Sequence, residues 1–175
     1  MQKSKLAQEI YKAAYIKGDF LLRSGQRSNE YFDKYRFESN PTLLKSIAQE
    51  MAQLLPADID ALAGLEVGGI PIATAISLET GLPVCFVRKT AKEYGTCQFA
   101  EGFDVQGKKL CVIEDVVTSG GQVILSTQDL RKAGAHIHHA VCVIDREQGG
   151  REKLGEIDLQ LKSLFTMSEL KASRS

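Results

Sequence analysis

Short apolar runs alternate with stretches of helical periodicity from about residue 58 onward, and this alternation most constrains the fold. The apolar runs are the expected strands 60–65, 84–88, 109–113 and 137–145. Between them the pattern predicts helices from about Ile70 to Thr80 and from about Gln122 to Ala133, the second closed by Gly134. Because strands that alternate with helices usually form a parallel sheet, we expect an α/β fold with a mostly parallel central sheet flanked by helices.

The two ends of the chain follow a different pattern. A helix carrying Leu6, Ile10 and Ala14 precedes expected extended segments at 20–23 and 31–37. A second helix opens at Ser39-Asn40-Pro41, and the chain finishes with an expected strand at 159–165 and a short helix begun by the capping pair Thr166 and Glu169. We expect one domain over residues 1–175, with a core at about 41–145 and a small hood formed by about 1–40 and 146–175.

Charge and composition exclude several classes of protein. Lys plus Arg and Asp plus Glu number 22 each, so the chain offers no overall basic field for nucleic acid. No apolar run approaches the roughly 18 residues that cross a bilayer, and no secretory signal is recognisable. The four scattered cysteines form no CxxC pair, which suits a reducing compartment. We therefore expect a cytoplasmic protein that binds neither nucleic acid nor membrane.

The segment from Lys109 to Gln122 carries most of the functional information. It runs from a buried strand through Glu114 and Asp115 into a turn of small residues and then a helix. In an open α/β sheet, ligands bind beyond the carboxyl ends of the strands, where these acids are expected. The glycines of the turn permit positive φ and close backbone approach, and Thr118 and Ser119 add hydroxyl donors, so the turn can hold a phosphate. Because carboxylates repel phosphate, Glu114 and Asp115 should face hydroxyls or a hydrated metal. A sugar phosphate offers hydroxyls to the acids and a phosphate to the turn.

Two well-known phosphate-binding motifs do not fit this segment. It lacks the Gly-Lys-Ser/Thr ending of the Walker phosphate loop and the three spaced glycines of the dinucleotide fingerprint. An ordinary strand-to-helix turn with solvated acids is the remaining alternative for the segment alone.

Residues 89–107 are polar and contain three glycines between two expected strands, and loops of that length are usually functional or mobile.

The segment Lys109–Gln122 resembles the phosphoribosyl diphosphate signature of type I phosphoribosyltransferases. Three further stretches resemble the orotate phosphoribosyltransferases of that family: Phe20–Gly25 with Tyr31-Phe32-Asp33, Arg88–Thr96, and Val143–Arg146 with Gly149-Gly150. The segment Gly64–Pro71 is similar to the family's diphosphate-binding turn. The resemblance covers nearly the whole chain and implies the type I phosphoribosyltransferase fold. It also implies transfer of phosphoribosyl from 5-phosphoribosyl 1-diphosphate to orotate, in pyrimidine biosynthesis.

The resemblance assigns a role to each site residue. Arg88, Lys89 and Lys92 are the implied catalytic cations, which would meet the negative charge on the departing diphosphate. Arg146 would meet the orotate carboxylate, for which a planar guanidinium suits better than a point charge. The implied substrate-binding residues are Glu114, Asp115, Val116, Val117, Thr118, Ser119, Gly120, Gly121, Gln122, Arg146, Arg23, Tyr31, Phe32, Tyr94 and Gly68.

The resemblance further implies a magnesium ion and a partner subunit. The Mg²⁺ is expected on the diphosphate and ribose hydroxyls, with Asp115 nearby and no direct protein ligand. The loop that starts at Arg88 is expected to reach across a homodimer interface, so that the two active sites are shared. Closure of such a loop would keep water from the cationic sugar.

Departures from the family pattern keep two alternatives open. Some orotate enzymes have lysine where Gly68 falls, histidine where Tyr94 falls, lysine where Arg23 falls and a hydroxyl residue where Gln122 falls. The chain could therefore use another nucleobase, or it could be a non-catalytic regulator that binds the sugar phosphate. A metal site at His136, His138 and His139 and a nucleophilic Cys97 are weaker readings, because neither has recognisable partners in the sequence.

Overall fold

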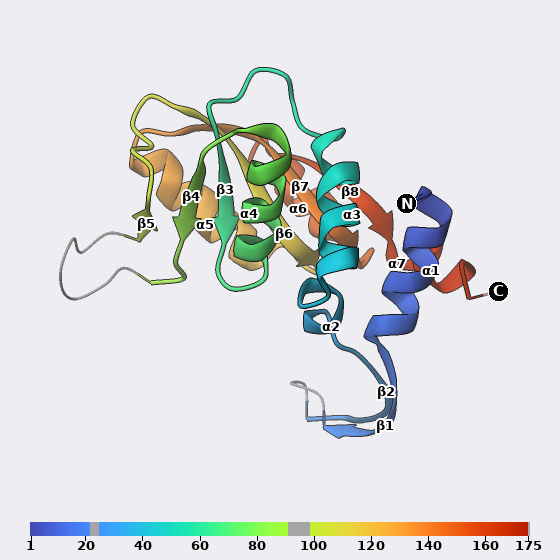
Figure 1. The fold of residues 1–175 in the computed structure, drawn as a ribbon. Helices are drawn as coiled ribbons and strands as arrows, with labels where there is room; N and C mark the ends of the chain where they lie inside the picture. The colour runs from blue at the N-terminus through green and yellow to red at the C-terminus, as the bar shows by residue number, and fades with distance from the viewer. Residues whose placement is uncertain (22–24, 91–98, 175) are drawn as a thin grey trace.

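A six-stranded sheet in the order β5-β4-β3-β6-β7-β8 forms the centre of the computed structural model (Figure 1), which describes residues 1–21, 25–90 and 99–174. All neighbouring strands are parallel except β4 and β5, which are antiparallel. The strands are β3 (Ala61–Leu65), β4 (Val84–Val87), β5 (Ala100–Glu101), β6 (Lys109–Val117), β7 (His136–Asp145) and β8 (Gln160–Thr166). The mostly parallel α/β sheet expected from the alternating pattern is confirmed.

Helices cover both faces of this sheet. One face packs against α1 (Lys3–Ala14), α3 (Pro41–Ala52) and α4 (Gly69–Thr80), and the other against α5 (Gly121–Lys132) and α6 (Gly150–Gly155). Alternate residues of each strand serve the two layers, since side chains along a strand point to opposite faces. In β6, Cys111 and Ile113 join the first layer, whereas Leu110 and Val112 join the second.

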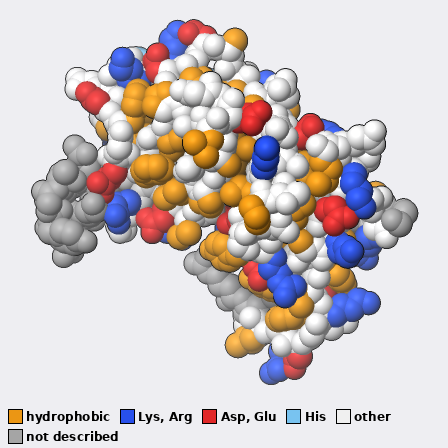
Figure 2. All heavy atoms as spheres, in the orientation of Figure 1, with side chains coloured by type: hydrophobic (Ala, Val, Ile, Leu, Met, Phe, Trp, Pro, Cys, Tyr) orange, Lys and Arg blue, Asp and Glu red, His pale blue; other side chains and the backbone are white. Residues whose placement is uncertain are grey.

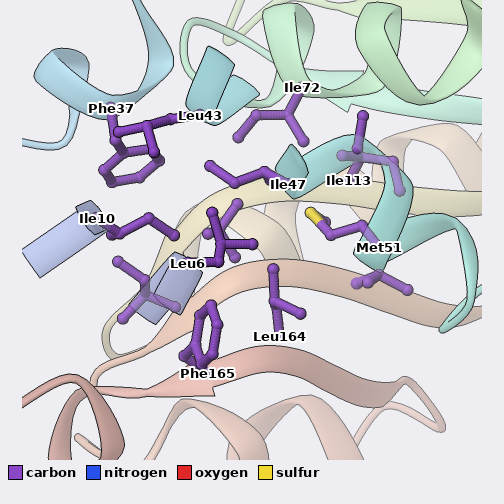
Figure 3. Packing of buried hydrophobic residues seen from close by; sticks show 14 of the residues in the cluster. Leu6, Ile10, Phe37, Leu43, Ile47, Met51, Ile72, Ile113, Leu164 and Phe165 are labelled. Atoms are coloured by element: carbon purple, nitrogen blue, oxygen red, sulfur yellow. The ribbon is translucent and has the colours of Figure 1, made fainter. Parts of the chain in front are cut away.

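The larger layer holds the N-terminal helices against the sheet. Figure 3 shows side chains from α1, α3, α4, β6 and β8 meeting in one apolar cluster. The labelled residues of this cluster are Leu6, Ile10, Phe37, Leu43, Ile47, Met51, Ile72, Ile113, Leu164 and Phe165, and all are buried. The N-terminal segment is therefore anchored to the core through its helices.

Local signals set the helix ends where the sequence predicts them. The Asn40 side chain accepts hydrogen bonds from the backbone N–H groups of Thr42 (3.0 Å) and Leu43 (3.2 Å), and Pro41 opens α3. Thr166 and Glu169 form the expected capping box of α7 (Met167–Ala172). Gly134 has a φ of 92° just beyond α5, as expected for a residue that follows a helix end.

The N-terminal segment differs in detail from the expectation. In place of extended segments at 20–23 and 31–37, β1 (Tyr15–Leu21) and β2 (Arg27–Phe32) form an antiparallel hairpin separate from the main sheet. The chain then turns into the short helix α2 (Tyr35–Glu38). Cross-strand pairing decides the bounds of this hairpin, and a mostly polar sequence gives no periodic signal for it.

The C-terminal segment does not form a cover as a whole, which corrects the expected hood at 146–175. The strand β8 pairs with β7 along most of its length and belongs to the central sheet, and α6 packs beneath it. Helix α7, which follows β8, lies beside α1 at the end of the molecule where both termini are found (Figure 1). The stretch 89–107 is also not a loop throughout, because Ala100–Glu101 forms β5.

Candidate active site

A cavity of about 930 Å³ lies beyond the carboxyl ends of β6 and β7, on the side that faces the hairpin. The surface in Figure 2 is hollowed on this side, between the main body and the hairpin. The residues that line the cavity are Tyr11, Tyr15, Ser28, Glu30, Tyr31, Phe32, Lys34, Tyr35, Glu66, Val67, Lys89, Glu114, Asp115, Val116, Thr118, Gln122, Arg146, Gln148, Met167, Lys171 and Arg174.

The two predicted acids lie near the carboxyl end of β6, at the floor of this cavity. Glu114 and Asp115 are both buried, and the Asp115 side chain is 1% exposed. Glu114 Oε1 accepts a hydrogen bond from the Asp115 backbone N–H at 3.0 Å, and Asp115 Oδ1 accepts one from the Val116 backbone N–H. The strand therefore continues through both acids to Val117, beyond its expected end at Ile113, and backbone donors fix both carboxylates.

Lys34 and Glu38 complete a buried ionic cluster with these acids. The Lys34 ammonium forms an ion pair with Asp115 Oδ2. Burial would raise the pKa of Asp115, but its interactions with Glu114 and Lys34 outweigh burial and hold that pKa below its ordinary value. Burial, followed by the charge of Asp115, raises the pKa of Glu38 to about 8 and that of Glu114 well above its usual range. Asp115 is therefore the ionised acid of the cluster, balanced by Lys34.

The turn after β6 has the geometry expected of a phosphate-binding turn. Gly120 adopts a φ of 76° and caps α5, whose first turn of backbone N–H groups has no partner within the helix. Thr118 and Gln122 line the cavity, and the Gln122 amide donates to Ser126 Oγ at 3.2 Å. The positive end of α5 and a hydroxyl group thus lie next to the acids.

A second turn, between β3 and α4, borders the same cavity. Glu66 and Val67 line it, and the peptide bond between them is cis. Glu66 Oε2 accepts a hydrogen bond from the Lys89 backbone N–H at 3.0 Å, so this turn also holds the start of the 89–107 stretch. A Cβ on Gly68 would lie 1.6 Å from Asp115 Oδ2, and a side chain at this position would collide with the acid. Gly68 therefore allows Asp115 to lie against the turn.

Arg146 presents an unused donor at the end of β7. Its backbone N–H donates to Val117 O at 2.9 Å, which fixes the residue beside the end of β6. Its side-chain Nε is buried without a hydrogen-bond partner, although the residue lines the cavity. Because a buried unpaired donor costs free energy, an anionic ligand in the cavity would be stabilised there.

The structure brings nine of the predicted site residues to this cavity and leaves others outside its lining. Those at the cavity are Tyr31, Phe32, Lys89, Glu114, Asp115, Val116, Thr118, Gln122 and Arg146. Arg88 does not line it, because its Nε donates to Glu101 Oε1 at 3.0 Å on the neighbouring strand β5. Val117 packs into the core, and Ser119, Gly120 and Gly121 contribute backbone to the turn without lining the cavity. Arg23, Lys92, Tyr94 and Cys97 lie outside the described residues.

Several residues of the cavity were not predicted from the sequence. Lys34, Lys171 and Arg174 bring three cations from the two ends of the chain. The Arg174 guanidinium lies 4.7 Å and 5.1 Å from the ring centroids of Tyr11 and Tyr15, which joins the C-terminus to α1. A surplus of basic residues near the C-terminus was a possible signal, but nothing local in the sequence links Lys34 to Asp115.

A magnesium ion fits this donor set. Mg²⁺ prefers oxygen ligands, keeps several waters and is usually held by one or two carboxylates together with substrate phosphates. Glu114 and Asp115 supply carboxyl oxygens at the cavity floor. Within residues 1–21, 25–90 and 99–174, no group of three or more His, Cys, Asp or Glu side chains could hold a metal, and this includes His136, His138 and His139.

The comparisons with known proteins agree with the geometry. The family model of the phosphoribosyl transferase domain matches residues 36–163. An orotate phosphoribosyltransferase of a Nocardioides species is 50% identical to this chain over 97% of its length and 94% of the relative. One from Methanocella arvoryzae is 45% identical over 87% of each chain.

The same similarity appears among solved structures. A crystal structure of orotate phosphoribosyltransferase from Mycobacterium tuberculosis superposes with a TM-score of 0.88 at 27% identity, over 96% of this chain and 98% of the other.

The helices of the described part of the chain include none long and apolar enough to cross a bilayer.

Proposed function

The chain belongs to the phosphoribosyl transferase family and, within it, to the orotate phosphoribosyltransferases, and from that premise we propose that it joins orotate to 5-phosphoribosyl 1-diphosphate. The products are orotidine 5-phosphate and diphosphate, in a step of pyrimidine biosynthesis. The observation that carries this proposal is the joining of three features in one cavity: the acids Glu114 and Asp115, the turn at Gly120 and the unpaired Arg146.

Glu114, Asp115 and the following turn hold the phosphoribosyl group in this proposal. The ribose hydroxyls bond to the carboxyl oxygens of both acids, and the 5-phosphate lies on the turn from Thr118 to Gln122 at the N-terminus of α5. The 12-residue helix α5 adds the favourable field of its positive end. Hydroxyls and phosphate are thereby oriented by groups fixed on a strand and a helix, which places the reacting carbon within the cavity.

Cations at the cavity act on the anionic parts of the two substrates. Arg146 binds the planar orotate carboxylate through its guanidinium, a match that an ammonium cannot provide. Tyr31 and Phe32 of the hairpin face the same space and supply apolar surface for the base. Lys89, together with Arg88 and Lys92, stabilises the charge that develops on the leaving diphosphate.

Magnesium is the proposed cofactor. Bound to the diphosphate and ribose oxygens, it would neutralise the leaving group's developing charge. Asp115 would help to hold the hydrated ion at the cavity floor, and the substrate oxygens would supply its direct coordination.

We propose that the working enzyme is a cytoplasmic homodimer with shared active sites. In the proposed dimer, Arg88, which pairs with Glu101 and does not line its own subunit's cavity, would act in the partner subunit's site.

The proposal is tested by following the absorbance of orotate with phosphoribosyl diphosphate and Mg²⁺. Loss of orotate that requires all three components is expected, and no loss above background at high enzyme concentration would contradict the proposal. Adenine, guanine, hypoxanthine and uracil, assayed side by side, test the alternative of another base. Binding of phosphoribosyl diphosphate without turnover of any base would indicate a non-catalytic regulator.

A further inference from the structure

Lys34 is a cation of the cavity that comes from the N-terminal segment rather than from the sheet. It immediately precedes α2, and its backbone carbonyl accepts hydrogen bonds from Phe37 (3.2 Å) and Glu38 (3.3 Å), so the residue is fixed at the start of that helix. Its side chain crosses to β6 and pairs with Asp115, 81 positions later in the chain. The side chain is 33% exposed and lines the cavity, so ligands can reach its ammonium.

The ammonium lies next to the turn between β3 and α4. Asp115 Oδ2, which it contacts, would be 1.6 Å from a Cβ on Gly68. Gly68 itself offers no side chain, and Glu66 on the same turn is negatively charged and already bonded to the Lys89 backbone. Of the described side chains on this turn, none is a cation. Lys34 therefore brings positive charge to a turn that lacks its own.

The ion pair also covers the acid that the ribose must reach. Asp115 is fully buried, and its Oδ2 has no hydrogen-bond partner beyond the ionic contact with Lys34. Its Oδ1 is occupied by the Val116 N–H. A ribose hydroxyl can therefore reach Oδ2 only if the ammonium shifts, and the long flexible stem of lysine permits such a shift.

We propose that Lys34 is a diphosphate-binding residue that rests on Asp115 until the substrate arrives. When the ribose hydroxyls take over Asp115, the ammonium moves to the diphosphate oxygens beside the Gly68 turn. The exchange leaves neither charge without a partner, since the ribose hydroxyls donate to Asp115 while the diphosphate oxygens pair with Lys34, and a buried charge without partners is costly. This inference rests on the proposed function, since it assumes that the turn holds the leaving group.

Titration of the purified full chain with phosphoribosyl diphosphate and Mg²⁺, in the absence of orotate, tests the inference without turnover, because this ligand brings both the ribose hydroxyls and the diphosphate. Lys34→Met keeps the length of the side chain and removes its charge, and it is expected to weaken phosphoribosyl diphosphate binding by about tenfold or more, as for loss of a charge-assisted contact. Lys34→Arg should keep most of the affinity. The control is Lys109→Met at the opposite end of β6, which removes an exposed lysine that also pairs with an aspartate, Asp58, and should leave the affinity unchanged.

Because Lys34→Met leaves Asp115 unpaired, a second comparison guards against a folding defect. The double variant Lys34→Met with Asp115→Asn should bind phosphoribosyl diphosphate about tenfold more weakly than Asp115→Asn alone. Equal affinities in both comparisons would overturn the inference. If the unchanged protein consumes orotate and Lys34→Met binds phosphoribosyl diphosphate normally, only this inference fails. If the unchanged protein transfers phosphoribosyl to no base, the proposed function fails instead.

Discussion

Arg146 shows how a single residue can indicate a ligand. Its buried Nε has no partner within the described part of the chain, while its backbone is fixed by Val117. Arg146→Lys preserves the charge but removes the planar fork, so the KM for orotate should rise by about tenfold to a hundredfold. The KM for phosphoribosyl diphosphate should change by less than about twofold. Steady-state kinetics with each substrate varied in turn measure both, and an unchanged KM for orotate would contradict the assignment.

Glu38 makes a prediction about pH. Its pKa is raised from 4.5 to about 8, first by burial and then by Asp115. Because the unfolded chain releases this proton near pH 4.5 and the folded protein near pH 8, the folded state binds more protons between these values. The free energy of unfolding should therefore fall as pH rises through that window, by at most about 1.4 kcal/mol per pH unit from this group.

Denaturant unfolding at several pH values between 5 and 8 tests this linkage. Glu38→Gln, which cannot ionise, should reduce the slope of stability against pH. Glu50→Gln in α3, at a residue that is only half-buried, serves as the control and should leave the slope unchanged. An identical slope in the unchanged protein and in Glu38→Gln would remove Glu38 as its source.

At the scale of elements, the contact between α6 and the turn after β6 is tight enough to be tested. A Cβ on Gly150 would lie 2.5 Å from Thr118 O and 2.7 Å from Val117 Cγ1. Gly150→Ala should therefore push α6 away from the turn, destabilise the protein by roughly 1–3 kcal/mol and weaken phosphoribosyl diphosphate binding. Gly155→Ala, in the same helix but in open space, is the matched control and should cost little. Thermal unfolding with and without ligand compares the two, and equal behaviour would contradict the contact.

The elements also show what could be read from the sequence. The strands of the core and the helices α4 and α5 were predictable, because continuous apolar runs and capping residues are local signals. The hairpin and the place of β8 in the sheet were not, since both depend on pairing between separate segments. The same holds within the site: the acids and the turn form one contiguous motif, whereas Lys34 meets Asp115 only through the fold. The pairing of Arg88 with Glu101 likewise required β5, which the sequence did not reveal.

At the scale of the whole molecule, shared active sites predict complementation between two inactive variants. Lys92→Ala removes a loop cation, and Asp115→Asn removes a group at the cavity floor. In a homodimer whose loops cross between subunits, a mixed dimer of the two variants has one intact site and one doubly damaged site. An equal mixture, unfolded and refolded together, should therefore recover about a quarter of the unchanged protein's activity. Recovery no greater than the average of the separate variants would show that each site is built from one chain.

The central claim is that Asp115 and the turn at Gly120 form one site for the phosphoribosyl group. The most direct measurement is a calorimetric titration of phosphoribosyl diphosphate with Mg²⁺ into the unchanged protein and into Asp115→Asn. The substitution is expected to weaken binding by roughly 1–3 kcal/mol, as for loss of a hydrogen bond to a charged group. Equal affinity of the two proteins would contradict it.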